Sequence, residues 1–267
     1  KSLYDISQKR MDPIPVFAEM GSSNPIVVLP DKLKEDENLA EQISNSILLG
    51  TGQFCTNPGL IFLSSDSDNF LEQVKKIFSN SETSSMVHPS IKENYINKIK
   101  EHENLGVKIY RSKKNNSLAS VGVITSENFL KNDFFKEEVF GPYSLIIKCK
   151  SVNQITEIIN FLPGQLTGTI LGSSNDIINN RNLVDVLEKK VGRLLFKGVP
   201  TGVSVTQSMC HGGPFPASTD SRFTSVGTDS IYRWLRPISY QNCPQDLLPE
   251  ALKDLNPLDI KQIKTKN

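Results

Sequence analysis

The chain has 267 residues, of which 37% are hydrophobic and 22% are charged. Its 30 basic and 29 acidic residues leave a formal net charge of +1, which gives no electrostatic reason to expect nucleic acid or an anionic membrane as a partner. No apolar run approaches the ~20 residues that a membrane-spanning helix needs. The composition is that of an ordinary globular protein with one large domain or two modest ones.

Short apolar runs alternate with helical patterns along most of the chain. Strands are predicted at 26–29, 60–63, 107–110, 120–124, 143–149, 167–171 and 193–196. Helices are predicted at 39–49, 68–78, 89–103, 152–161 and 176–190. In the helix over 89–103, the apolar face is predicted to hold Ile91, Tyr95, Ile96 and Ile99. This alternation predicts a three-layer α/β domain with a mainly parallel sheet.

The chain has four scattered cysteines and no C-x-x-C pair, so no metal site is predicted. Four such thiols in a chain of this size indicate reduced cysteines and a cytoplasmic protein. Cys149, Cys210 and Cys243 are predicted to be small buried apolar residues. This prediction does not extend to Cys55, which lies in a glycine-rich segment.

The three histidines show no spacing that suggests a pair with a cysteine. His88 and His102 lie in polar surroundings and are predicted to be exposed. His211 is predicted to shape a loop rather than to act as a base.

Cys55 lies in the most informative segment, GTGQFCTNPG at 50–59. A predicted helix ends in glycines, the cysteine follows, and a Pro-Gly pair leads into an apolar strand. Glycines let a ligand approach the backbone closely, and a cysteine at such a junction can present its sulfur to a cleft with its own N–H free to bind an oxyanion. The alternative is a cysteine that fills a gap beneath a glycine-rich turn.

Two further segments place carboxylates before glycine turns. Glu19 is predicted at the end of a strand, where a carboxylate in a partly dry cleft can act as a general base. The alternative is an exposed or capping glutamate. Glu137 and Glu138 precede Phe140 and a Gly-Pro turn. Carboxylates can bind ribose hydroxyls and a phenylalanine can pack on a nicotinamide ring, but an ordinary loop would look the same.

Taken together, the Glu-Met-Gly, Gly-Gln-x-Cys and Glu-Glu-x-Phe-Gly-Pro segments resemble the aldehyde dehydrogenase superfamily in their order and separation. The resemblance covers essentially the whole chain. It narrows to the 2,5-dioxovalerate (α-ketoglutarate semialdehyde) dehydrogenases through the segments 15–25, 198–203, 211–222 and 233–241. It implies oxidation of a small-molecule aldehyde, with NAD or NADP as cofactor, through a thiohemiacetal and a thioester.

The same resemblance implies roles for individual residues. Cys55 would be the nucleophile, and Glu19 the general base for hydrolysis of the thioester. Glu138 would bind the nicotinamide ribose, Phe140 would position the ring, and Gly21 would lie against the cofactor. The residues expected to contact the substrate are Phe54, Thr56, Val203 and Arg222.

Most of the family's cofactor-binding domain precedes the position that matches Lys1. We therefore expect residues 1–19 to be the last piece of that domain, 20–236 to be the catalytic domain and 237–267 to be a C-terminal tail. The chain is then expected to be part of a longer enzyme, inactive in isolation and homo-oligomeric at full length. The alternative is a catalytically silent remnant that serves as a folded or partner-binding module.

Overall fold

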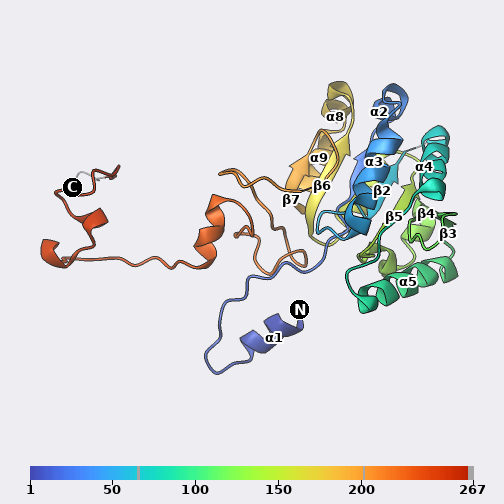
Figure 1. Ribbon diagram of the computed structural model, residues 1–267. Coiled ribbons are helices and arrows are strands. Elements are labelled where there is room, and N and C mark those ends of the chain that lie inside the picture. Colours follow the sequence, from blue (N-terminus) through green and yellow to red (C-terminus); the bar gives the residue numbers. More distant parts are fainter. Residues whose placement is uncertain (65–66, 201, 264–267) are drawn as a thin grey trace. The chain divides into compact units, whose positions relative to one another are not determined.

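The computed structural model describes residues 1–64, 67–200 and 202–263. Seven of its strands form one sheet (Figure 1). The strands are β1 (Ile26–Val28), β2 (Leu60–Leu63), β3 (Lys108–Arg111), β4 (Ser120–Thr125), β5 (Tyr143–Lys148), β6 (Gln165–Leu171) and β7 (Val191–Leu195). Their order in the sheet is β3–β4–β5–β2–β1–β6–β7. The pairings are parallel except for the edge pair of β3 and β4.

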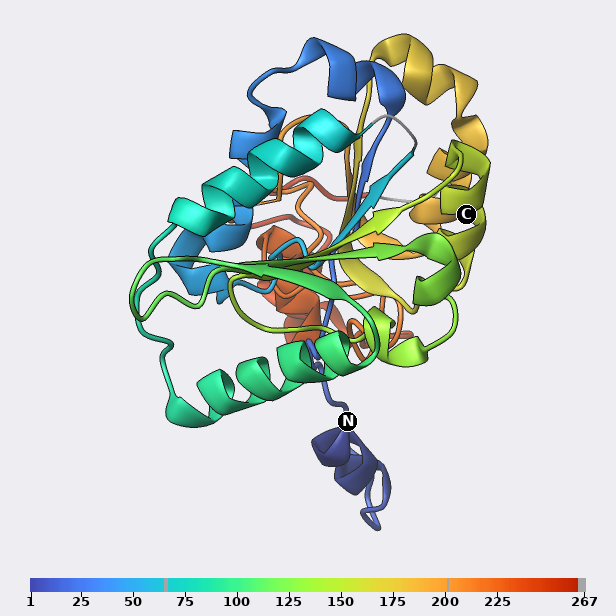
Figure 2. The same ribbon diagram turned by 90° about the vertical axis from the view of Figure 1, so that its right-hand side faces the viewer.

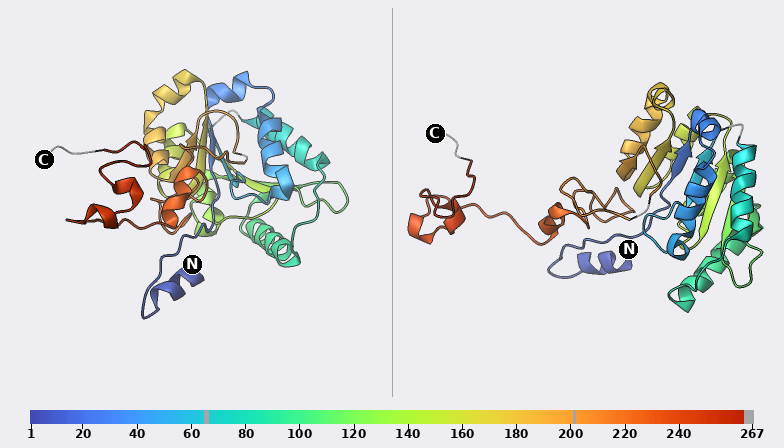
Figure 3. Two further views of the ribbon diagram at one scale, coloured as in Figure 1. Left: turned by 60° about the vertical axis from the view of Figure 1, so that its left-hand side comes forward. Right: turned by 45° about the horizontal axis from the view of Figure 1, so that its top comes forward.

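Helices cover both faces of this sheet (Figures 2 and 3). On one face lie α3 (Leu39–Leu48) and α4 (Asp68–Asn80), and on the other α7 (Val152–Asn160) and α9 (Arg181–Glu188). The remaining helices are α1 (Ser2–Gln8), α2 (Pro30–Glu35), α5 (Pro89–Asn104), α6 (Ser126–Phe129) and α8 (Ser174–Asn179). Short 3₁₀ turns are η1 (Leu49–Gly52), η2 (Asp133–Lys136), η3 (Thr228–Arg233), η4 (Gln245–Leu247) and η5 (Glu250–Leu252).

The alternation of side chains along the strands produces two hydrophobic cores, one on each face. Ile26 and Val28 of β1 join the core beneath α3 and α4, whereas Val27 joins the core beneath α7 and α9. Because the central strands are buried on both faces, their sequences are apolar without interruption. The predicted three-layer α/β architecture with a mainly parallel sheet is confirmed.

The buried face of α5 differs from the prediction. It consists of Tyr95, Ile99 and His102, spaced as neighbours along one side of a helix. Ile96 falls outside this stripe and is 45% exposed, so its predicted burial is wrong. The predicted exposure of His102 is also wrong: its Nδ1 lies 2.8 Å from the Tyr143 hydroxyl, and burial lowers its pKa to about 4.

The helix predicted over 176–190 is interrupted in the structure. It divides into α8 and α9 at Asn180, whose φ of −112° and ψ of 38° are not helical. The backbone N–H of Asn180 donates to the Asp176 carbonyl at 3.1 Å and so closes α8.

The chain separates into two compact units, Lys1–Ser230 and Ile231–Asn267. The second unit contains only short 3₁₀ turns in its described part. There the Gln262 amide donates to the carbonyls of Ala251 and Lys253 at 3.0 and 3.2 Å. Among the helices that the structure describes, we find none with the length and apolarity to cross a membrane.

The contact of Gly52 with Gly141 generates a prediction about stability. Gly52 has a φ of +65°, and a Cβ at this position would collide with the Gly141 carbonyl. Gly52→Ala should therefore lower the free energy of unfolding by about 3 kcal/mol or more, because left-handed strain and overpacking add. Gly106→Ala is the matched control, since Gly106 also has a positive φ (+92°) but open space around it. Urea unfolding measures both variants, and equal losses would show that the Gly52 contact is not close.

Candidate active site

Cys55 lies in the loop between α3 and β2. After α3 ends at Leu48, three consecutive residues have positive φ: Gly50 (57°), Thr51 (60°) and Gly52 (65°). This left-handed stretch redirects the chain after the helix, and glycine adopts such a conformation most readily. Cys55 follows it and is exposed. Cys55 is thus not packed beneath the turn, which argues against the gap-filling interpretation of this segment.

Asn24 anchors the loop that carries Cys55. Its side-chain amide donates to the carbonyls of Cys55 and Asn57, both at 2.9 Å. Its Oδ1 accepts from the Thr167 N–H at 3.2 Å and from the Thr167 hydroxyl at 3.0 Å. The Asn57 amide in turn donates to the Gly141 carbonyl at 3.1 Å. The backbone at Cys55 is therefore fixed against β6 on one side and against the 137–142 loop on the other.

Glu19 does not lie at the end of a strand, so that part of the prediction is wrong. It lies in an extended segment that forms an isolated antiparallel bridge with Ser218. On either side of the bridge, Met20 N–H donates to the Ala217 carbonyl at 2.9 Å and Thr219 N–H donates to the Ala18 carbonyl at 3.0 Å. A loop more than 190 residues away in sequence, rather than a sheet, sets the position of this carboxylate.

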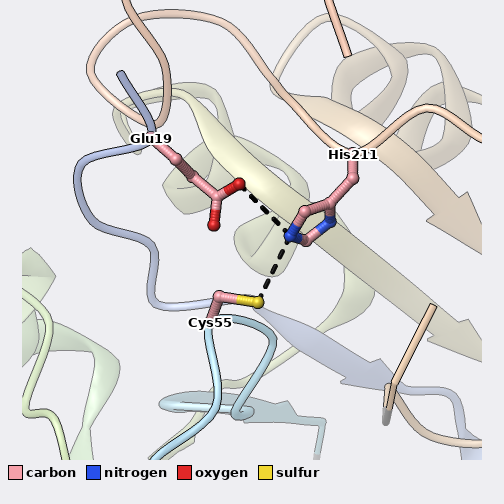
Figure 4. A group of neighbouring side chains, drawn as sticks. All are labelled: Glu19, Cys55 and His211. Carbon is pink, nitrogen blue, oxygen red and sulfur yellow. Dashed lines mark hydrogen bonds and ion pairs between the residues drawn. The ribbon is translucent and has the colours of Figure 1, made fainter. Parts of the chain in front are cut away.

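That loop also carries His211, which contacts both predicted catalytic groups (Figure 4). Its Nε2 lies 3.2 Å from Cys55 Sγ and 3.3 Å from Glu19 Oε2. His211 is 3% exposed, and its backbone N–H donates to the Thr224 hydroxyl at 2.8 Å. The spacing of the histidines in the sequence did not suggest this pair, and His211 was interpreted as a loop-shaping residue more than as a base. Since 156 residues separate the two, only the tertiary fold brings them together.

The charges of these three side chains depend on one another. The contact with Cys55, and then the hydrogen bond to Glu19, raise the pKa of His211 to about 9 in spite of its burial. The hydrogen bond to His211 lowers the pKa of the Glu19 carboxyl. At neutral pH the site therefore holds an imidazolium and a carboxylate, and the Cys55 sulfur lies directly against the cation.

A cavity of about 350 Å³ adjoins this cluster, and its lining includes Glu19, Gly21, Cys55, Glu138 and Phe140. Burial raises the pKa of Glu138 to about 7, against the opposing effect of a hydrogen bond from the Ser22 backbone. A Cβ on Gly21 would lie 3.1 Å from Glu138 Oε2, so a side chain there would crowd the carboxyl group. A sheltered carboxyl group with an aromatic ring close by fits the hydroxyl-bearing, planar nicotinamide end of a dinucleotide.

Among the described residues, the lining of this cavity does not include the four that were predicted to contact the substrate, namely Phe54, Thr56, Val203 and Arg222. The Phe54 ring lies over Gly50, and Thr56 is buried. Arg222 binds Asp220 through Nε at 2.9 Å and Nη2 at 2.6 Å, with 81% of its side chain exposed. Their contact with a substrate stays a prediction.

Arg193 of β7 was not singled out by the sequence analysis, although a charged residue within an apolar strand was an available signal. Burial lowers the pKa of its guanidinium, and the neighbouring Cys55 and Cys210 sulfurs act in the opposite direction. Its Nη1 lies 3.8 Å from Met209 Sδ, a weak acceptor. Among the residues that the structure describes, its Nε has no hydrogen-bond partner and no acidic group forms an ion pair with it. A partly desolvated guanidinium in this state is unusual.

Comparison with known protein sequences shows which family the chain belongs to. The sequence model of the aldehyde dehydrogenase family matches residues 1–186. The chain is 39% identical to alpha-ketoglutaric semialdehyde dehydrogenase 2 of Azospirillum brasilense, over 98% of the chain and 52% of that protein. The chain belongs to the aldehyde dehydrogenase family.

Two further matches cover a similar share of the relatives' own lengths. The alpha-ketoglutaric semialdehyde dehydrogenase of Acinetobacter baylyi is 39% identical over 98% of the chain and 52% of its own length. A solved 1-pyrroline-5-carboxylate dehydrogenase superposes with a TM-score of 0.69 at 21% identity, covering 88% of this chain and 47% of its own. The chain thus spans about half the length of these aldehyde dehydrogenases. Arg193 and His211 lie beyond the residues that the family model matches.

We predict that Cys55 is the most reactive of the four thiols. The predicted burial of Cys149 is confirmed, whereas Cys210 and Cys243 are only partly buried. Burial raises the pKa of Cys149 to about 12 and also raises that of Cys210, and the thiolate is the reactive form. Limited iodoacetamide labelling of the native chain, followed by mass spectrometry, should find Cys55 modified first. Cys55→Ser is the control, and earlier labelling of Cys149, Cys210 or Cys243 would contradict the prediction.

Proposed function

We propose that this chain is the catalytic part of an NAD(P)-dependent aldehyde dehydrogenase that forms a thioester on Cys55. The observation that supports the proposal most directly is the cavity shared by Cys55 and Glu19 with Glu138 and Phe140. Membership of the family supports the class of reaction. The chain would act together with the part of the family's length that it does not span, which would complete the dinucleotide site.

In the proposed reaction, the Cys55 sulfur bonds to the aldehyde carbon while the carbonyl electron pair moves to oxygen. The Cys55 backbone N–H can stabilise this oxyanion, and one such donor is worth about 3 kcal/mol in comparable sites. A nicotinamide held beside Glu138 and Phe140 would supply the hydride acceptor; the oxyanion electron pair would re-form the carbonyl as hydride leaves the carbon, which would leave a thioester on Cys55. Glu19 then takes a proton from water as the water attacks the thioester carbon. The carbon–sulfur bond breaks, the acid leaves and Cys55 is restored.

We further propose that the substrate is an anionic aldehyde, with α-ketoglutaric semialdehyde as the specific candidate. The guanidinium of Arg193 has no acidic partner among the described residues, and its charge interacts with the Cys55 sulfur. A substrate carboxylate paired with Arg193 would satisfy that cation while the aldehyde carbon approaches Cys55. Arginine binds carboxylates through two parallel hydrogen bonds, which also orients the bound group. Two relatives at 39% identity are named for this substrate.

The catalytic roles predict two different losses of activity. In a chimera that joins the upstream half of the Azospirillum brasilense relative to this chain, Glu19→Gln should keep a single-turnover burst of NAD(P)H. Its steady-state rate should fall by about 10²–10⁴-fold, because the amide cannot accept a proton from water. Cys55→Ala should abolish both phases, since no covalent intermediate can form.

Glu93→Gln, at an exposed position of α5, is the control for this experiment. Loss of the burst in Glu19→Gln would mean that Glu19 acts before hydride transfer. An unchanged steady-state rate would assign the base to another group. A parent chimera that folds and binds the dinucleotide but never reduces it would leave the chain as a silent module and refute the proposed function.

The substrate proposal predicts a selective effect at Arg193. In the same chimera, Arg193→Met should raise the KM for α-ketoglutaric semialdehyde by about 10–100-fold, because a charge-assisted pair worth ~1.5–3 kcal/mol is lost. The kcat/KM for an uncharged aldehyde such as pentanal should fall by a clearly smaller factor, since that substrate has no carboxylate to lose and only the interaction of the guanidinium with the Cys55 sulfur is removed. Arg222→Met is the matched comparison. A selective loss in Arg222→Met, with none in Arg193→Met, would return the role to the residue predicted from the sequence.

A further inference from the structure

Neither the hydride step nor proton transfer to Glu19 involves His211, although its Nε2 contacts the reacting sulfur. We propose that His211 is the cationic partner of Cys55 and holds its sulfur as a thiolate in the resting site. The inference rests on the proposed role of Cys55 as nucleophile. The step is a single proton transfer from Sγ to Nε2, which gives a thiolate and an imidazolium. No other group gains or loses charge.

The decisive feature is that Cys55 and Glu19 contact the same ring nitrogen (Figure 4), at 3.2 and 3.3 Å. In a Ser-His-Asp relay the acid binds the opposite nitrogen and fixes a neutral base. Here the opposite nitrogen, Nδ1, is buried and has no hydrogen-bond partner among the described residues. Glu19 therefore does not orient a neutral imidazole from behind. It places a negative charge beside the proton that Nε2 shares with the sulfur, and this charge favours the imidazolium.

Four further titratable or charged side chains, each from a different segment, lie around the pair of Cys55 and His211. Glu19 stabilises the imidazolium directly, and Arg193 on β7 adds a positive charge that interacts with the Cys55 sulfur. Cys210 precedes His211 in the chain, and burial raises its pKa, so it stays neutral at pH 7. Glu138, across the cavity, interacts with Glu19. Glu19 also interacts directly with Cys55, where a carboxylate opposes a thiolate, so the imidazolium between them and the Arg193 guanidinium have to outweigh this repulsion. The pKa of His211, raised to about 9, agrees with an imidazolium at this position.

The same contact has a second effect later in the reaction. When water attacks the thioester, the sulfur leaves as a thiolate, and a better-stabilised thiolate leaves faster. The imidazolium of His211 is already within hydrogen-bond distance of that sulfur. His211 would therefore lower the barrier both to the addition of Cys55 and to its departure.

The test uses the native chain and does not require a cofactor. The rate of Cys55 alkylation by iodoacetamide is measured between pH 5.5 and 9.5 for the wild type, His211→Gln and His88→Gln. An ordinary thiol with a pKa near 8.5 is only about 1% thiolate at pH 6.5. The wild type and the exposed-histidine control His88→Gln should keep their rates at pH 6.5 within about 3-fold of those at pH 8.5. His211→Gln should lose at least about 10-fold over the same interval.

A second measurement does not depend on the folding of the His211 variant. The ultraviolet absorbance of a thiolate in the wild type, minus that of Cys55→Ser, should persist at pH 6.5. A wild-type alkylation rate that falls about tenfold per pH unit below pH 8 would overturn the proposal, as would an unchanged profile in folded His211→Gln. An active chimera with such an ordinary thiol would refute only this inference. An inactive chimera with a low-pH thiolate would refute only the proposed function.

Discussion

The geometry of the site depends on a small buried network of amides and hydroxyls around Asn24. Gln165, the first residue of β6, accepts from the backbone N–H groups of Ser23 and Asn24 at 2.6 and 3.1 Å. The Ser22 hydroxyl contacts Asn24 Oδ1 at 2.8 Å, while the Asn24 amide holds the carbonyl of Cys55. Each buried polar group of this kind costs about 1–3 kcal/mol when it is unpaired. The network therefore strongly favours a single arrangement of these segments. It thereby fixes the segment after Glu19 against both β6 and the nucleophile loop.

The pKa values of two carboxyl groups that line one cavity are shifted in opposite directions, and the cause differs for each. The pKa of Glu19 is lowered by its bond to His211, whereas that of Glu138 is raised to about 7 by burial. Neighbouring titratable groups whose environments push their pKa values apart are typical of sites in which each group has a different acid–base role. At neutral pH, Glu19 is fully charged, while Glu138 is present in both protonation states. A protonated Glu138 can donate a hydrogen bond as well as accept one, which suits a hydroxyl-bearing ligand.

The sequence predicted features that depend on neighbours along the chain. Continuous apolar runs identified the central strands, and the glycines around Cys55 marked a junction where a sulfur is accessible. His211 was misjudged because its partners lie 156 and 192 residues earlier, and no spacing rule connects them. The burial of His102 was missed because its polar flanks are helix neighbours in sequence, whereas its contacts are Tyr143 and two phenylalanines. The position of Arg193 within an apolar strand was visible in the sequence, but its lack of an acidic partner among the described residues was not, because that depends on every neighbour in space.

Thr51 adopts a φ of +60° between two glycines that share this conformation. A β-branched residue in the left-handed region stores about 1–2 kcal/mol of conformational energy. Thr51 and Gly52 are both buried, so the surrounding packing, not the turn itself, maintains this conformation. A loop held in this way has little freedom to relax when a group is attached to its cysteine. The nucleophile would then keep one position as the sulfur gains and loses its acyl group, and the cycle would proceed with little reorganisation of the backbone.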